Sequence, residues 1–373
     1  MPSPDIVVIG AGVIGCAVAH ECARRGASVD VVDDRAPGMG ATQASAGMLA
    51  PWLEASSGPL LDLSVRSLKA WDAFVPRVSS DSGAAFGYHR TGTLSVALDD
   101  ATFDSLAAVA ETLKAQDIDR ELLDAGSVQV CEPALSVDVR GGLLIPSHGS
   151  VNAHELTRTL AAAARHHGAR ILEHGRVRCV TRTGGEFSVV TEHGPLTADI
   201  VVVAAGSWAG AIDLDGTERV PVHPVRGQLL RLGWHGDPLA RIVWGEACYI
   251  VPWTDGTLLV GATVEDVGFD ERNTADGVLG LIEAATALVP HLAHAAFLSA
   301  RAGLRPGTPD DLPIIGPSPS VPGLWYATGH YRSGVLMAPL TATLIADAVL
   351  EGKVDPILSA TAPHRFVRSL EAQ

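Results

Sequence analysis

Three glycines with the spacing Gly10-x-Gly12-x-x-Gly15 follow an apolar run and precede a segment that suits a helix. In such a turn the first glycine permits a sharp bend, the second lets a pyrophosphate approach the backbone, and the third lets the helix lie close to the strand. The helix N-terminus then carries partial positive charge that attracts phosphate groups. The pattern therefore predicts a dinucleotide-binding turn.

An acidic residue completes this motif further along the chain. Asp33 follows Gly15 by 18 residues, close to the spacing of roughly 20 at which a carboxylate accepts the ribose hydroxyls of an adenosine. Arg35, two positions later, is of the type that could accept a 2′-phosphate instead. Because the acidic residue stands at the strand end, an unphosphorylated ribose is favoured.

The residues around the motif predict the elements that position it. Residues 5–9 form a continuous apolar run, as in a strand buried on both faces, and residues 13–25 suit a helix that stops at Gly26. Residues 28–32 have the pattern of a second buried strand. Together these segments predict a β-α-β unit.

Later segments are predicted to extend the same sheet. They are a helix over 151–167, strands over 170–177, 199–206 and 323–329, a hairpin formed by 186–191 and its neighbours, and a helical run from the Gly-rich turn at 330–334 to residue 350. Pro339 lies early in that last helix and predicts irregular first turns. A helix N-terminus at this turn would favour the negative charge that develops on a reduced flavin.

A loop of small residues at 40–48 stands where an ordinary NAD domain would continue into another crossover helix. The hydroxyl groups of Thr42 and Ser45 and the backbone amides of this loop could line a second polar face of a ligand. A plain surface loop would have the same composition. Composition leaves both interpretations open.

Composition and charge exclude several classes of protein. Hydrophobic residues make up 47% and charged residues 18% of the 373 residues, which excludes a disordered chain and a coiled coil. Lys and Arg number 27 against 42 Asp and Glu, a formal charge of −15 without a basic run, so nucleic acid is not an expected partner. The first residues lack the basic region and cleavage site typical of a signal peptide, and the longest apolar runs fall short of the ~20 residues that span a bilayer. We expect a soluble cytoplasmic protein without membrane contact.

Metal and disulfide chemistry are not predicted either. The five cysteines are scattered without CxxC spacing, and the fourteen histidines show no HExxH or paired spacing. We therefore expect reduced thiols and no metal site.

Several segments together carry a resemblance that covers nearly the whole chain. Besides the N-terminal glycine motif, they are Ser45-Ala-Gly-Met48, Asp199–Gly206 with Ser207-Trp208, Cys248-Tyr-Ile-Val-Pro252, Ala302–Thr308 and Gly329-His-Tyr-Arg-Ser-Gly334. With these segments the chain resembles the FAD-dependent D-amino acid oxidase (DAO) family, and within it the glycine oxidases of thiamine biosynthesis. The resemblance implies FAD as the cofactor. A second GxGxxG motif and a CxxxxC pair are both missing, which disfavours a pyridine-nucleotide disulfide reductase.

The resemblance also implies the cofactor contacts. Added to Gly10, Gly12 and Gly15, these are Val13, Ile14, Asp33, Asp34, Ala41, Thr42, Ala46, Gly47, Met48, Val177, His330, Tyr331, Arg332, Ser333, Gly334, Val335 and Leu336. Sarcosine oxidase relatives attach FAD through a cysteine near the segment that matches 308–316, where this chain has none. We therefore predict non-covalent FAD.

The predicted fold class is α/β (α+β), with a Rossmann-like FAD-binding domain and a second, antiparallel-sheet substrate domain. The substrate domain is indicated by β-type alternation in 88–98 and 220–264. We predict a discontinuous FAD-binding domain at 1–87, 146–218 and 301–373. The substrate domain then comprises 88–145 and 219–300.

Three residues are implied as substrate ligands. The resemblance makes Arg305 the anchor of a substrate carboxylate, for which a guanidinium fork is the matching shape. Tyr249 and Arg332 match further substrate-side positions. Trp253 stands where glycine oxidases commonly carry an arginine, and with Trp52 it is expected to reshape the pocket for a bulkier or more apolar amine.

The implied activity is oxidative deamination of glycine or another small D-amino or N-methyl amino acid. Hydride passes to flavin N5, and O2 reoxidises the flavin to give hydrogen peroxide and an oxo acid. The partners are then an amino acid substrate and O2, and the family's tetramers imply a homo-oligomer (homotetramer). Alternatives are a dehydrogenase of the same fold with another electron acceptor, acting on D-amino or 2-hydroxy acids, a non-enzymatic nucleotide-binding sensor, and an NAD-linked dehydrogenase.

Overall fold

A central six-stranded sheet carries the predicted β-α-β unit. The computed structural model describes residues 4–55, 57–217 and 219–366. The sheet has the order β20-β21-β13-β1-β2-β9, parallel except where β20 pairs with β21. Its strands are β1 (Ile6–Ile9), β2 (Val29–Val32), β9 (Arg170–Leu172), β13 (Ile200–Val203), β20 (Ile314–Pro317) and β21 (Leu324–Thr328). Strands β1 and β2 are fully buried, as their apolar runs predict.

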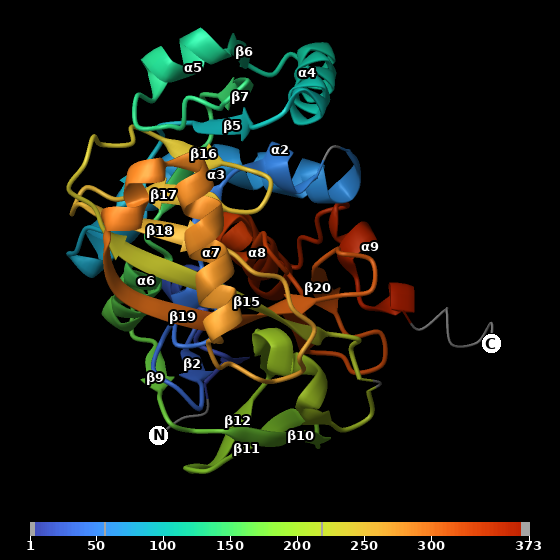
Figure 1. The fold of residues 1–373 in the computed structure, drawn as a ribbon. Helices are drawn as coiled ribbons and strands as arrows, with labels where there is room; N and C mark the ends of the chain where they lie inside the picture. Colours follow the sequence, from blue (N-terminus) through green and yellow to red (C-terminus); the bar gives the residue numbers. More distant parts are fainter. Residues whose placement is uncertain (1–3, 56, 218, 367–373) are drawn as a thin grey trace.

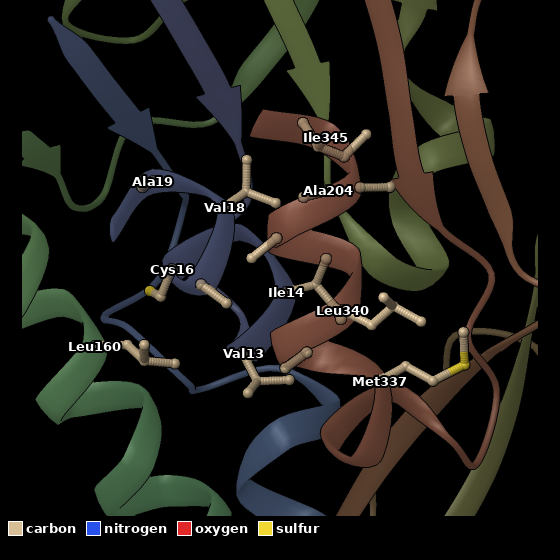
Figure 2. Close-up of a cluster of buried hydrophobic side chains, with 14 of the residues drawn as sticks. Val13, Ile14, Cys16, Val18, Ala19, Leu160, Ala204, Met337, Leu340 and Ile345 are labelled. Atoms are coloured by element: carbon tan, nitrogen blue, oxygen red, sulfur yellow. The ribbon is translucent and has the colours of Figure 1, made fainter. Parts of the chain in front are cut away.

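Helices cover one face of this sheet. They are α1 (Val13–Arg24), α3 (Gly58–Ser82), α6 (Ala153–His166) and α8 (Gly334–Glu351). Helix α1 packs between α6 and α8, and α3 packs across both of these. In Figure 2, Ile14 of α1 lies against Leu340 of α8, while Leu160 of α6 lies on the opposite side of α1. The layer is a continuous apolar core.

Helix α8 is long and apolar enough to cross a membrane by composition, but 67% of it is buried inside the protein. Its carbonyl at Leu336 accepts hydrogen bonds from Ser67 Oγ and Trp71 Nε1 of α3, at 2.7 and 2.9 Å. Pro339 lies within the helix without ending it. The expected irregularity in the first turns is therefore wrong, and α8 is a core helix.

A second sheet covers the opposite face of the central one. It has the order β12-β11-β10-β14 and comprises β10 (Val177–Thr183), β11 (Glu186–Thr191), β12 (Gly194–Ala198) and β14 (Asp213–Leu214). We expected segments 170–177 and 186–191 to extend the central sheet. Strand β9 does so, but β10 and β11 leave it, because Val180, Phe187 and Val189 pack face-on against Val7 and Val201 of the central sheet.

The third sheet is the predicted antiparallel one. Its eight strands have the order β19-β15-β18-β17-β16-β5-β7-β6, and only β16 and β5 pair in parallel. They are β5 (Thr93–Ala97), β6 (Glu121–Asp124), β7 (Gly141–Ile145), β15 (His223–Gly233), β16 (Ile242–Trp244), β17 (Tyr249–Pro252), β18 (Thr257–Gly261) and β19 (Ala296–Gly307). The predicted domain boundary at residue 301 falls inside β19, whose whole length pairs with β15.

Short elements join these layers. Helices α4 (Asp100–Ala115), α5 (Ala125–Cys131) and α7 (Ala275–Leu288) pack on the eight-stranded sheet, and β3 (Met48–Leu49), β8 (Gly149–Val151) and β4 (Tyr88–His89) form a small sheet. The remaining elements are η1 (Ala41–Ala44), α2 (Pro51–Glu54), η2 (Gly206–Ala211), η3 (Pro290–His294) and α9 (Leu358–Thr361). Figure 1 shows α4 and α5 at the end of the molecule opposite β10–β12.

Candidate active site

A cavity of about 1020 Å³ lies where the carboxyl ends of β1 and β2 meet the eight-stranded sheet. Ligands of parallel α/β sheets bind at this end of the strands. The cavity wall includes η1, the start of α1, the 330–335 turn, β17 and β19. Its size is at the upper end for small-molecule sites and suits an extended ligand.

The glycine turn brings α1 close against the central sheet. Gly10 has φ +110°, and a Cβ there would lie 2.4 Å from the carbonyl oxygen of Ala204. A Cβ on Gly15 would lie 1.9 Å from the carbonyl oxygen of Gly10. Gly12 is the N-cap of α1, and it has no side chain that could accept a hydrogen bond from the first amides of the helix. Gly12, Val13 and Ile14 line the cavity. This end of α1 is therefore suited to phosphate groups.

Asp33 lies at the end of β2 and also lines the cavity. Its Oδ2 accepts a hydrogen bond from the Ala11 amide at 2.6 Å, and its Oδ1 accepts one from the Arg35 amide at 2.8 Å. Burial nevertheless raises the pKa of Asp33 to about 6. The carboxylate thus has spare lone pairs beside the phosphate-binding turn, as the sequence predicts for a ribose acceptor.

The loop of small residues at 40–48 lies on the cavity wall. Gly47 has φ +66°, and a Cβ there would lie 1.8 Å from the carbonyl oxygen of Val151, so the loop sits tightly against β8. Thr42 Oγ1 accepts a hydrogen bond from the Val13 amide at 3.2 Å, which joins the loop to the start of α1. Of the two interpretations that composition left open, the structure favours a ligand-facing loop.

The 330–334 turn follows β21, two strands from β1 in the central sheet, and lines the cavity at the start of α8. His330 is buried, its Nε2 lies 3.0 Å from Thr341 Oγ1, and burial lowers the pKa of this ring to about 3. Tyr331 has φ +48°, which turns the chain into α8. His330 is therefore an uncharged ring at neutral pH.

Most of the predicted cofactor contacts lie on the cavity wall. Those that line it are Gly10, Gly12, Val13, Ile14, Asp33, Asp34, Ala41, Thr42, Ala46, Gly47, Met48, Val177, His330, Tyr331, Arg332, Gly334 and Val335. Gly15, Ser333 and Leu336 do not line it. Gly15 packs α1 onto the strand, while Ser333 and Leu336 are buried at the start of α8.

The predicted substrate ligands also meet at this cavity. Tyr249 on β17, Arg305 on β19 and Arg332 before α8 all line it. Arg305 Nη1 donates hydrogen bonds to the carbonyl oxygens of Thr263 and Arg226, at 2.9 and 3.3 Å. Arg332 is exposed, and its guanidinium lies 5.3 Å from the centre of the Tyr331 ring.

A network that the sequence did not reveal holds Arg305 in place. Arg226, which is 3% exposed, forms ion pairs with Glu265 and Asp270, and the backbones of Arg226 and Glu265 bond to each other. Burial alone would raise the pKa of Glu265, but hydrogen bonds from Arg226 and its neighbours lower it to about 2. The network fixes the segment that presents the Thr263 carbonyl to Arg305. Arg226 and Glu265 are 39 residues apart in the sequence, so only the pairing of their backbones reveals the network.

Trp244 was also missed, and it lines the cavity with its ring 5.5 Å from that of Tyr249. In contrast, Trp253 and Trp52 are not among the described residues that line this cavity. Trp253 packs on Gly87 and lies 5.9 Å from the His89 ring, and Trp52 stacks on His148 at 5.3 Å. Neither tryptophan forms part of the wall, but Trp253 packs in one cluster with Met48 and Tyr249, which do, so its effect on the pocket stays a prediction.

The sheet arrangement and this cavity define the class of fold: a dinucleotide-binding half joined to an antiparallel half, with a ligand cavity between the two sheets. The chain belongs to the DAO family, "FAD dependent oxidoreductase", whose model matches residues 5–348. This confirms the family and the FAD cofactor that the sequence motifs imply.

Several known proteins resemble the chain over most of its length. It is 33% identical to the glycine oxidase of Geobacillus kaustophilus over 92% of each chain, and the crystal structure of that enzyme superimposes with a TM-score of 0.89 over 95% of this chain and 96% of the other. The iminodiacetate oxidase of Chelativorans sp. BNC1 is 30% identical with a TM-score of 0.88, over 96% of this chain and 98% of the other.

A bifunctional protein ThiO/ThiG of Synechocystis is 36% identical over 97% of this chain. The chain spans about half (54%) of the length of that relative.

The residues present fit FAD. Side chains at Gly10 and Gly15 would collide with backbone atoms, so both positions keep the backbone at the close spacing that a phosphate cradle needs. Asp33 supplies a carboxylate for a ribose, and the cavity continues from there to Met48 and Arg305. When bound, FAD supplies an electron-pair acceptor at the substrate end of this cavity.

Proposed function

We propose that the chain oxidises glycine or another small D-amino or N-methyl amino acid, with O2 as electron acceptor. The observation that carries this proposal is the position of Arg305 on the cavity wall, together with the resemblance to a glycine oxidase over 92% of the chain. The likeness to an iminodiacetate oxidase supports the inclusion of secondary amines.

Arg305 is built to receive a carboxylate. Its Nη1 group is engaged by two backbone carbonyls, and within the described part of the chain no residue accepts a hydrogen bond from Nε or Nη2. This leaves one edge of the guanidinium with two parallel N–H groups, which matches the two oxygens of a carboxylate. Because the other edge is fixed, little side-chain entropy is lost on binding.

Tyr249 and Arg332 complete the proposed substrate site. The Tyr249 hydroxyl would donate a hydrogen bond to the substrate carboxylate, and the exposed Arg332 would add positive charge at the mouth of the cavity. With the carboxylate held, the α-carbon hydrogen is oriented toward the cofactor. We propose that the amine binds uncharged, so that no residue of the chain acts as a general base.

The balanced reaction is amino acid plus O2 plus water to oxo acid, ammonia and hydrogen peroxide; an N-methyl substrate would release methylamine. The α-carbon is oxidised by two electrons, and O2 is reduced to peroxide. Water supplies the carbonyl oxygen of the oxo acid when the imino acid hydrolyses.

We propose that FAD is held without a covalent bond. Cys248 lines the cavity, but burial raises the pKa of its thiol to about 12, so it is not a thiolate that could attack the flavin ring. Acid denaturation should release all of the yellow chromophore into the supernatant. Colour that stays with the precipitate would contradict this proposal.

The activity is tested by anaerobic mixing of the purified holoenzyme with glycine, sarcosine and a panel of D- and L-amino acids, while the flavin absorbance is followed. We expect bleaching by glycine or small D-amino acids, and recovery with peroxide formation when air is admitted. Bleaching that persists in air and reverses only with an artificial acceptor would support a dehydrogenase. Yellow protein that no amino acid bleaches would refute the assignment.

A further inference from the structure

Three metal-ligating side chains meet on the helical side of the molecule, outside the cavity. His20 comes from α1, Asp81 from the last turn of α3, and His167 directly follows α6. His20 Nε2 lies 2.7 Å from Asp81 Oδ2, and His167 Nε2 lies 3.1 Å from the same oxygen. The three candidate ligand atoms all lie within 4.8 Å of one another. Packing of three helices thus gathers two imidazoles and one carboxylate at a single point.

Hydrogen bonding within the protein satisfies this cluster only in part: His20 Nε2 and Asp81 Oδ2 form a hydrogen bond, but two other ring nitrogens have no partner. His20 is fully buried, and its Nδ1 has no hydrogen-bond partner in the described structure. His167 Nε2 is buried too, and despite its distance from Asp81 it makes no well-directed hydrogen bond. Buried polar atoms are normally paired, and each exception calls for an explanation. One explanation for the His167 nitrogen is a ligand bound between it and the carboxylate.

We propose that His20, Asp81 and His167 bind a divalent metal ion of the zinc type. Two neutral imidazole nitrogens and one carboxylate oxygen form a donor set that zinc accepts, with bonds of about 2.0–2.2 Å. Tetrahedral ligands at that bond length lie roughly 3.3 Å apart. The two separations from Asp81, 2.7 and 3.1 Å, therefore have to open slightly to admit the ion, and the third separation, between the two histidines, is at most 4.8 Å.

The surroundings allow an ion to enter and a fourth ligand to bind. The side chains of Asp81 and His167 are 19% and 25% exposed, whereas His20 is 0% exposed. The histidine ligand atoms are buried, so solvent reaches the cluster at the Asp81 carboxylate, where water can complete the coordination. None of the three residues lines the FAD cavity, so the bound ion would act on the protein and not on the substrate.

The place of the cluster in the fold indicates what the ion would do. Helix α1 begins at the phosphate-binding turn and carries His20 two turns further along, packed between α6 and α8. An ion shared by α1, α3 and α6 would link the three helices behind that turn. The proposed role is stabilisation of the folded state, since an ion that binds only the native protein shifts the unfolding equilibrium.

The test starts from the purified holoenzyme treated with a chelator and then dialysed. Zinc is added in steps, bound metal is counted by elemental analysis, and Tm is measured. We expect one zinc ion per chain and a saturable rise in Tm of about 3 °C at 100 times Kd. Absence of binding, or binding without a change in Tm, would refute the proposal.

Two matched variants locate the site. His167→Gln removes one ligand at a partly exposed position, and His166→Gln changes the exposed neighbouring histidine, whose ring lies 5.1 Å from that of His167. We expect zinc affinity to fall at least 100-fold in His167→Gln and to stay within twofold in His166→Gln. Equal binding by both variants, or loss in His166→Gln alone, would assign the metal to another site.

A spectroscopic measurement on the unmodified holoenzyme covers the case in which His167→Gln does not fold. Cobalt(II) added in place of zinc should give the visible absorption of a four-coordinate nitrogen and oxygen site at wavelengths beyond the flavin bands, and zinc should displace it. Weak absorption typical of six-coordinate aqueous cobalt would contradict the proposed geometry. Neither readout depends on the amino acid oxidase activity.

Discussion

The cofactor side and the substrate side of the cavity are built in different ways. On the cofactor side, the turn at Gly10–Gly15 and the carboxylate of Asp33 come from one stretch of 24 residues, and contacts to backbone dominate. On the substrate side, Tyr249, Arg305 and Arg332 come from two strands and a turn spread over 84 residues. They meet only through the pairing of the eight-stranded sheet and through the turn before α8, where the Tyr331 amide donates a hydrogen bond to the Pro306 carbonyl of β19.

This difference separates two kinds of recognition. Phosphates and a ribose are bound by a fixed backbone shape, which glycines specify locally. A small carboxylate is bound by a side chain held in place by other side chains and carbonyls, as Arg305 is by Thr263 and the Arg226 network. Mutations on the cofactor side should therefore affect FAD content and stability together, whereas those on the substrate side should affect substrate binding alone.

The largest expected effect is that of Gly15→Ala. The new Cβ would lie 1.9 Å from the Gly10 carbonyl oxygen, so α1 has to move away from the strand. Overpacking of this kind costs about 1–3 kcal/mol or more, and the displaced helix should no longer bind FAD tightly. The ratio of flavin to protein absorbance and the Tm measure both effects.

Gly280→Ala is the matched control, because a Cβ at this exposed position in α7 meets nothing within 4 Å. It should keep full FAD and be neutral or more stable, since alanine is favoured over glycine in a helix by about 1 kcal/mol. Full FAD content in Gly15→Ala would show that the close approach of α1 is not needed.

Asp33 should make FAD binding pH-dependent. Without FAD, burial raises the pKa of Asp33 to about 6. The ribose hydroxyls of FAD would donate hydrogen bonds to the ionised carboxylate. FAD affinity of the apoprotein should therefore rise about tenfold from pH 5 to pH 7 as the carboxylate ionises. Because the pKa of Asp33 is higher in the folded apoprotein than in the unfolded chain, it adds to the free energy of unfolding at low pH. This added stability is lost as the pH rises from about 4 through 6.

Asp33→Asn should weaken FAD binding about 10- to 100-fold at pH 7, the equivalent of one hydrogen bond to a charged group. It should also abolish the pH dependence, which fluorescence titration of FAD into apoprotein measures. A variant that keeps the tenfold rise would assign the titration to a different group.

Local signals explain why the cofactor side could be predicted. The spacing Gly10-x-Gly12-x-x-Gly15 and the apolar runs around it determine β1, α1 and β2 without long-range information. For Arg305, spacing alone did not distinguish a ligand from a surface arginine, and the family resemblance identified it as a candidate.

What the sequence missed depends on packing. The Arg226–Glu265 network requires the antiparallel register of β15, and the turn of β10 away from the central sheet depends on where Phe187 packs. The cluster of His20, Asp81 and His167 joins residues 61 and 86 positions apart, which no spacing rule detects.

Tyr249→Phe should have a smaller effect, confined to the substrate side. The ring keeps its packing against Trp244 and Gly261, and only the hydroxyl is lost. One hydrogen bond is worth about 1 kcal/mol, so we expect KM for glycine to rise about fivefold with FAD content and Tm unchanged. Steady-state peroxide assays give KM, and a fall in FAD content would show that Tyr249 also supports the cofactor side.

Trp253→Phe should have the smallest effect on activity. The side chain packs against Gly87 and the loop near Met48 but does not reach the cavity wall. We expect kcat/KM for glycine within about twofold of the unmodified enzyme and a Tm lower by a few degrees, because a smaller ring leaves space in the cluster. A tenfold change in preference among amino acids would place Trp253 in substrate selection.

The central claim is tested most directly by anaerobic rapid mixing of Arg305→Lys with glycine, beside Arg231→Lys as a control from an outward position on β15. Loss of the bidentate contact should weaken glycine binding by about 2–3 kcal/mol. The glycine concentration for half-maximal flavin reduction should therefore rise about 30- to 150-fold, with FAD content and Tm unchanged. The control should match the unmodified enzyme. Unchanged glycine binding in Arg305→Lys, or loss of FAD together with activity, would contradict the division of the cavity into two independent sides.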